Sequence, residues 1–285
     1  MQPDFREVAE SVGLRPRSIL EDDRIHRCPT ELHPKTRNGA YRTDGYRGWV
    51  KNWETGETAV WREAREAHRS GPRVPLPSLA KRRAEEAAAA AFAAKIARHK
   101  VSKATLQTHP YLAKKGFPKV RGLVFEGLLL VPARIDGQIV SLQEITADGM
   151  KMTLKDSKIG GASYSIGTGR DEILCEGYST GLSIWTAASG LHLPVRVTCC
   201  FAAANVAAVA EKRREAVVMA DNDKPLPQFG MLGAGEFYAR RTGLPWTMPP
   251  EAKTDANDLH LAGGLPALQA LILRLFEMNR TRSAA

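Results

Sequence analysis

Long apolar runs are absent from this sequence of 285 residues. The longest uninterrupted run covers residues 87–94, which is eight residues, whereas a transmembrane helix needs about 20. The first residues, MQPDFREVAE, also lack the basic-then-apolar pattern of a signal peptide. We therefore expect a cytoplasmic protein with no membrane partner.

Cysteine is scarce as well. The sequence contains four cysteines: Cys28, Cys175, Cys199 and Cys200. They form no CxxC pair, which argues against a disulfide framework and a cysteine-rich zinc site and favours a reducing compartment. Near the N-terminus, His26, Cys28 and His33 lie close together, but a structural zinc site needs four ligands. We expect no zinc.

Several nucleotide-binding and hydrolase motifs are missing. The sequence has no GxxxxGK[ST], HExxH or GxGxxG, which argues against a P-loop motor, a zinc protease and a dinucleotide-binding fold. One hydrolase-like motif is present, because GYSTG at residues 177–181 matches GxSxG, and Asp221 and His260 follow in the order of a serine hydrolase. That interpretation leaves Glu176 unexplained, and we regard it as the weaker one.

The positive charge is concentrated in the first part of the chain. Residues 1–167 hold 29 Lys and Arg against 19 Asp and Glu, a net +10, whereas residues 168–285 hold 12 of each and are neutral. This asymmetry is typical of a polyanion-binding module joined to a neutral catalytic domain. A basic surface without a partner explains the charge equally well, so charge alone does not decide the function.

Residues 1–70 predict a small, turn-rich module. Asn38-Gly, Asp44-Gly and the ETGE segment at 54–57 lie between short strand-like segments and favour tight hairpin turns. The linker that follows holds three prolines in residues 71–78.

Aromatic and basic residues are interleaved in this module. Such a composition suits single-stranded DNA, because bases stack on the rings while cations follow the phosphates. Tyr46, Arg42 and Arg47 are the candidates for template binding, whereas Trp49 and Trp61 are expected in the core of the module.

The middle of the chain predicts a helix and then strands. Residues 71–100 comprise the linker and an alanine-rich helix that Ser78 caps. Residues 101–167 have the pattern of a basic, strand-rich α+β subdomain.

The last domain, residues 168–275, alternates apolar runs with helical segments and is followed by a tail at 276–285. The runs are EILCE, VRVTCCF, AVVMA and PWTM, and the helical segments are 178–189, 204–214, 230–242 and 265–277. This alternation predicts an α/β domain, with a mainly parallel sheet flanked by helices.

Acidic residues follow three of the predicted strands. Glu176 ends the first, Asp221 and Asp223 follow another, and Asp255 and Asp258 come after a third. Ligands bind beyond the carboxyl ends of strands in open α/β sheets. Crowded carboxylates repel one another unless a divalent cation neutralises them, and hard oxygen ligands suit Mg²⁺ or Mn²⁺. Helix capping explains any one of these residues, but explains all three loops less well.

This order of acidic motifs resembles the Toprim domain. ILCEGYSTGLSIWTA, VVMADND and KTDANDLH are similar to the three Toprim motifs of phage and plasmid primases. THPYLAKKG, LLLVPARIDGQIVSLQEI and KMTLKDSKIGGASYSIG resemble the basic subdomain that precedes Toprim in those enzymes, and residues 22–57 resemble their leader module. The likeness covers most of residues 20–265 and is most specific from about 109 to 260.

The resemblance assigns roles to these residues. It makes Glu176 an acid, base or metal ligand, and Asp221 and Asp223 the metal-binding pair, with Asp255 and Asp258 as looser matches. The basic residues it places against nucleotide or template are Arg134 and, less closely, Lys151 and Lys158.

The resemblance therefore implies a DNA primase, which joins ribonucleoside triphosphates on a single-stranded DNA template. The reaction is expected to use two metal ions, either Mg²⁺ or Mn²⁺. Since the sequence has no P-loop, such a primase needs a separate helicase as a partner or works alone on strands that are already displaced. One position departs from cellular primases, where an aspartate takes the place of Thr180. A Toprim nuclease and a non-catalytic nucleic-acid-binding protein remain alternatives.

Overall fold

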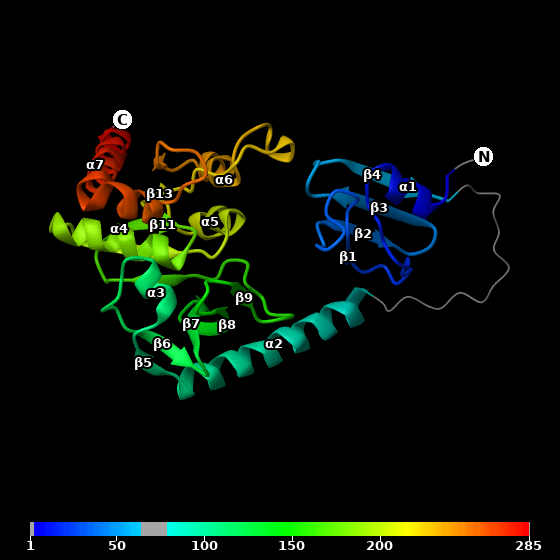
Figure 1. Ribbon diagram of the computed structural model, residues 1–285, viewed down its shortest axis with the longest axis horizontal. Coiled ribbons are helices and arrows are strands. Elements are labelled where there is room, and N and C mark those ends of the chain that lie inside the picture. The colour runs from blue at the N-terminus through cyan, green and yellow to red at the C-terminus, as the bar shows by residue number, and fades with distance from the viewer. Residues whose placement is uncertain (1–2, 64–78, 285) are drawn as a thin grey trace. The chain divides into compact units, whose positions relative to one another are not determined.

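The structure is a computed structural model that describes residues 3–63 and 79–284. It divides into two compact units, which we treat separately (Figure 1). The first comprises residues up to 82 together with 226–231, and the second comprises residues 83–225 and 232 onward. The predicted linker at 71–78, Ser78 and the first domain's end at residue 70 lie outside the described residues.

The first unit is a four-stranded antiparallel sheet with one short helix. Its elements are α1 (Phe5–Ser11), β1 (His26–Cys28), β2 (Gly39–Thr43), β3 (Arg47–Asn52) and β4 (Thr58–Arg62), and the strands lie in sequence order. Asp4 and Glu7 form a capping box that starts α1. Phe5, Tyr41 and Trp61 lie in the buried core between α1 and one face of the sheet.

Two of the three predicted hairpin turns are confirmed. Gly45 and Gly56 have positive φ angles of 83° and 80° in the turns that precede β3 and β4, which glycine adopts readily. The prediction for Asn38-Gly39 is wrong, because Gly39 is the first residue of β2. A Cβ there would lie 2.9 Å from Cys28 Sγ and from Leu14 Cγ, so close packing, not a turn, explains this glycine.

The second unit begins with a long helix on an antiparallel sheet. The elements are α2 (Leu79–Lys103), β5 (Thr105–Gln107), α3 (Pro110–Lys114), β6 (Gly122–Phe125), β7 (Leu128–Ile135), β8 (Gln138–Ile145) and β9 (Lys151–Thr153). The sheet runs β5-β6-β7-β8-β9. Ala97 of α2 packs on Leu130 and Leu142, and Lys100 Nζ binds Glu144 Oε1 at 2.5 Å. Residues 101–167 thus combine a helix with strands, in agreement with the predicted α+β character, and they lie within the larger second unit.

A second sheet completes this unit. It contains β10 (Tyr164–Ile166), β11 (Asp171–Cys175), β12 (Val195–Cys199), β13 (Val217–Met219) and β14 (Trp246–Thr247), in the order β10-β12-β11-β13-β14. All pairs are parallel except the edge pair of β10 and β12. The four apolar runs are therefore strands of a mainly parallel sheet, as predicted.

Helices cover both faces of this sheet. They are α4 (Tyr178–Gly190), α5 (Ala203–Ala210), α6 (Ala234–Thr242) and α7 (Ala256–Ala284). Ile173 and Cys175 pack with residues of α4 and α7, whereas Leu174 packs with residues of α5 and α6 (Figure 1). Because successive side chains of a strand point to opposite faces, β11 is buried on both sides.

The last predicted helix begins where expected and extends further. The label α7 covers two helical segments between Ala256 and Ala284, which meet at a kink where Gly264 has non-helical angles (φ 71°, ψ −178°). The predicted helix at 265–277 lies in the second segment. In the described part of the chain, α7 alone is long and apolar enough to cross a membrane, judged by length and composition. Leu268, Ile272 and Leu275 are fully buried in the core shared with α4, whereas only 17% of the most apolar stretch of α7 is buried.

Candidate active site

Carboxylates from two strand ends meet at one edge of the parallel sheet. Glu176 directly follows β11, and Asp221 and Asp223 follow β13, which pairs with β11. Since β12 lies on one side of β11 and β13 on the other, the winding of the sheet reverses at β11. Such switch points leave a crevice beyond the strand ends, where α/β proteins bind ligands.

Two glycines hold the Asp221–Asp223 loop in place. The amide of Gly235 donates to Asp223 Oδ2 at 2.8 Å. A Cβ on Gly235 would lie 2.2 Å from the carbonyl oxygen of Asp221, and one on Gly233 would lie 2.5 Å from that of Asp223. The start of α6 therefore packs against the acidic loop.

The third acidic loop pairs with the second. Asn222 and Thr254 form a β-bridge, in which the Asn222 amide donates to Thr254 O at 2.9 Å. This pairing places Asp255 beside the strand ends. Thr180 Oγ1 donates to Asp255 Oδ2 at 3.0 Å, so Thr180 binds a carboxylate of the cluster.

Asp258 has a different role from Asp255. Its Oδ2 accepts from the Asp255 amide at 3.1 Å, while Asp255 Oδ1 accepts from the Asp258 amide at 2.9 Å. Its other oxygen lies 3.8 Å from Lys115 Nζ. Asp255 and Asp258 thus cap the start of α7 reciprocally, and Asp255, unlike Asp258, is among the main charges that raise the pKa of Glu176 and Asp221.

The cluster favours protonation of two carboxylates. Burial raises the pKa of Glu176 to about 7, with further upward shifts from Asp223 and Asp255 against a downward one from Lys151. Burial and the charges of Glu176, Asp255 and Asp223 raise the pKa of Asp221 to about 8. Asp221 Oδ1 is also buried and lacks a hydrogen-bond partner within the described residues.

These residues fit a hard divalent cation. A buried, unpartnered carboxylate oxygen is costly unless a cation or donor satisfies it. Glu176, Asp221 and Asp223 supply oxygen donors of the kind that Mg²⁺ and Mn²⁺ prefer. Among the residues that the structure describes, no group of three His, Cys, Asp or Glu side chains has a ready ligand arrangement.

Lys151 is the basic residue that the fold brings to the cluster. Its charge lowers the pKa of both Glu176 and Asp221, and its Nζ lies 3.7 Å from the position a Cβ would take on Gly177. Lys151 is exposed at the start of β9, so it joins the antiparallel sheet to the acidic edge of the parallel sheet. Its placement agrees with its predicted role toward nucleotide.

Asn205 fixes the Gly160-Gly161 loop beside this edge. Its Oδ1 accepts from the Gly161 amide at 2.6 Å, and its Nδ2 donates to the carbonyl oxygens of Ala162 and Cys200 at 2.8 and 2.7 Å. Cys200 directly follows β12, and β12 pairs with β11, the strand that Glu176 follows. Sequence reasoning missed Asn205, since a lone asparagine in an alanine-rich helix carries no pattern.

Arg134 and Lys158 are not brought to the carboxylates by any contact in the described residues. Arg134 is exposed at a bulge in β7, donates to Gly137 O at 3.0 Å, and pairs through its backbone with Ser163. Lys158 is exposed in the loop after β9.

In the first unit, two predicted template residues already bind carboxylates. Arg42 forms a bidentate pair with Asp23, at 2.8 and 2.9 Å. Arg47 Nε binds Asp44 Oδ2 at 3.1 Å. Tyr46 is exposed in the same turn, as a stacking residue requires.

The histidines, Cys28 and Trp61 of this unit make contacts within the unit, whereas Trp49 does not lie in its core. His26 binds Asp22 at 2.7 Å and His33 binds Glu54 at 2.6 Å, while Cys28 is buried in the core. Trp61 is buried as predicted, and its Nε1 donates to Pro3 O. Trp49 is only half-buried and is not part of that core.

The serine-hydrolase alternative is wrong. Ser179 is buried on α4 and accepts from Tyr111 Oη at 3.0 Å, whereas His260 Nδ1 contacts Ser183 Oγ at 3.1 Å. Ser179 is thus paired with a tyrosine and His260 with another serine.

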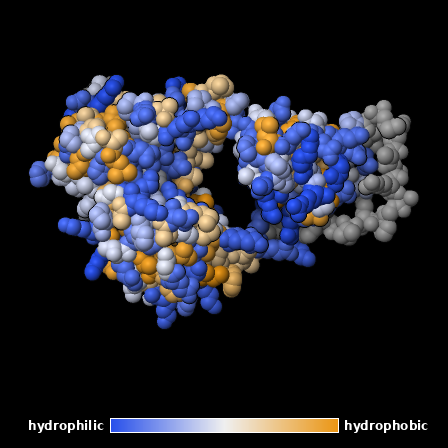
Figure 2. Space-filling view, in the orientation of Figure 1, coloured by the Kyte–Doolittle hydropathy of each residue, from blue (hydrophilic) through white to orange (hydrophobic). Residues whose placement is uncertain are grey.

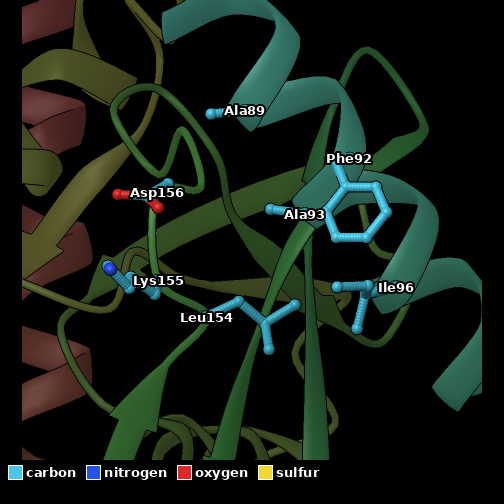
Figure 3. A pocket seen from close by; sticks show the side chains of 7 residues that line it. All are labelled: Ala89, Phe92, Ala93, Ile96, Leu154, Lys155 and Asp156. Carbon is cyan, nitrogen blue, oxygen red and sulfur yellow. The ribbon is translucent and has the colours of Figure 1, made fainter.

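A cavity of about 310 Å³ lies elsewhere in the second unit (Figure 3). It is formed by Phe92 and Ile96 of α2 and by Leu154, Lys155 and Asp156 after β9. None of the clustered carboxylates lines it, so the cavity is separate from the candidate active site.

A comparison of the chain with protein-family models and with curated protein sequences found no match.

Proposed function

We propose that the protein is a DNA primase, which makes short RNA primers on single-stranded DNA by metal-dependent nucleotidyl transfer. The observation that carries this proposal is the carboxylate cluster at the β11 and β13 ends, with a buried Asp221 oxygen that has no partner within the described residues. The resemblance to Toprim primases supports the same conclusion from the sequence. We also propose that the mainly parallel sheet and its flanking helices form a Toprim domain.

Asp221, Asp223 and Glu176 would hold Mg²⁺ or Mn²⁺, with Asp255 held beside them by Thr180. When bound, the ions supply positive charge that stabilises the reacting phosphate and the leaving pyrophosphate. The hydrogen bond from Gly235 fixes the Asp223 carboxylate, so its second oxygen is the one offered to a ligand.

Glu176 suits proton transfer. Its pKa of about 7 lies near neutral pH, where a general base is most effective. The 3′-hydroxyl oxygen of the growing primer attacks the α-phosphate of the incoming nucleotide, its proton passes to Glu176, and pyrophosphate departs. Lys151 lies close enough to the cluster to lower the pKa of Glu176, and its ammonium group would bind the triphosphate.

The test compares synthesis with binding in one variant. Asp223→Asn should lower primer synthesis at least about 100-fold, because a metal ligand is lost, while affinity for single-stranded DNA stays equal or rises, because a repulsive charge is removed. Glu211→Gln, at an exposed position after α5, is the matched control. Unchanged synthesis by Asp223→Asn would place the metal-binding residues elsewhere.

A further inference from the structure

The β1–β4 sheet has one face that the first unit does not use for its core. Side chains alternate along each strand, and Tyr41, Val50 and Trp61 point to the core beneath α1. The other face carries a row of cross-strand neighbours, which runs from Arg27 to Ala40, then to Lys51 and then to Thr58. The larger side chains of this open sheet face are those of Arg27, Arg42, Arg47, Trp49, Lys51, Val60 and Arg62.

The open sheet face is strongly basic. None of the residues in β1, β2, β3 and β4 is acidic, although Asp23 and Asp44 reach Arg42 and Arg47 from neighbouring loops. Arg47 stands directly opposite Arg62 in the ladder.

Aromatic rings lie among these cations. Trp49 is half-buried between Arg42 and Val60, its cross-strand neighbours. Trp53 continues the same side of β3 and is 39% exposed, with Lys51 Nζ 3.9 Å and the Arg27 guanidinium 5.4 Å from its ring centre. Val60 is 85% exposed, which leaves an apolar contact beside Trp49.

We infer that the open sheet face binds single-stranded DNA, with bases against Trp49, Trp53 and Val60 and phosphates along the arginines and Lys51. Stacking on aromatic rings requires unpaired bases, and the surrounding cations match a phosphate backbone. The surface of the first unit is mostly hydrophilic, with small apolar areas (Figure 2). The inference deepens the proposed function, because it names the surface that would hold the template.

Binding of the full chain to a fluorescein-labelled, mixed-sequence single-stranded DNA of 20 nucleotides tests this inference, without nucleotides or divalent metal. Trp49→Ala should weaken binding about 5- to 100-fold, whereas Trp49→Phe should stay within about threefold, because a ring remains. Arg62→Gln should weaken binding about threefold to tenfold and reduce the slope of log K against log salt by about one. Unchanged melting temperatures would show that the variants are folded.

Arg6→Gln is the matched control, since Arg6 lies on α1, against the opposite face. It should leave both affinity and salt slope unchanged. The inference is overturned if folded Trp49→Ala and Arg62→Gln bind like the unchanged protein, or if a duplex of the same sequence binds as tightly as the single strand. Binding through this face by a protein that makes no primers would contradict the proposed function and leave the inference intact.

Discussion

Asp221 combines burial with three neighbouring negative charges. Its carboxylate follows β13 at the sheet edge, and Glu176, Asp255 and Asp223 all favour its protonated form. Burial of a carboxylate beside other negative charges costs free energy, so such a residue is expected to serve binding or catalysis. Its position could be predicted from the sequence, because an acidic residue directly follows an apolar strand. Its burial and missing hydrogen bond could not, because they depend on α6 and on the loop before α7.

The raised pKa of Asp221 predicts how stability depends on pH without metal. The folded protein keeps protons on Glu176 and Asp221 that the unfolded chain releases above about pH 4, so the free energy of unfolding should fall as pH rises from about 4 to about 8. Asp221→Asn should raise it by about 1–3 kcal/mol at pH 8 and leave it nearly unchanged at pH 4. Urea denaturation at both pH values measures this difference. Equal stability at pH 8 would show that Asp221 is not strained by its neighbours.

At the scale of elements, the sequence predicted the strands of the parallel sheet better than the boundaries of the helices that flank it. Four apolar runs became β11, β12, β13 and β14, because hydrophobic runs between helical segments leave few other arrangements. The first part of α7 was missed, because Gly264 interrupts the apolar pattern. Asn38-Gly39 was misread as a turn, because the sequence does not show that Cys28 and Leu14 pack against Gly39.

The contact between α6 and the acidic loop gives a prediction at this scale. Gly235→Ala places a Cβ where the Asp221 carbonyl oxygen lies 2.2 Å away, so the loop or the helix must shift. We expect a loss of about 1–3 kcal/mol in stability and a loss of primer synthesis.

Gly160→Ala is the control for this variant, because a Cβ at Gly160 meets no atom within 4 Å. Thermal unfolding and primer synthesis of both variants measure the effect. If Gly235→Ala behaves like Gly160→Ala, the glycine does not position the acidic loop.

At the scale of the whole molecule, binding and chemistry are assigned to different units. The first unit has its own core of residues such as Phe5, Tyr41 and Trp61, and the second has separate cores. The charge asymmetry did not indicate this division, because the basic part of the sequence extends to residue 167, well inside the second unit. The open sheet face was not predictable there, because the side on which Trp49 lies depends on the strand register.

Removal of residues 1–75 therefore has a definite expected result. The remaining chain should unfold at a temperature close to that of the second unit in the whole protein, because its cores do not include the removed residues. Its affinity for single-stranded DNA should fall about 10-fold or more. Calorimetry and fluorescence anisotropy measure the two effects. Unchanged affinity would assign the first unit to protein docking instead of template binding.

The most direct test of the account is an assay that follows both nucleic acids at once. The protein is mixed with end-labelled single-stranded DNA of mixed sequence, differently labelled ribonucleotides, and Mg²⁺ or Mn²⁺, beside Asp221→Asn. We predict short labelled oligoribonucleotides that require the metal and disappear in the variant, while the DNA stays intact. Metal-dependent loss of the DNA without primers would contradict the account in favour of a nuclease, and neither product would contradict it in favour of a binding protein.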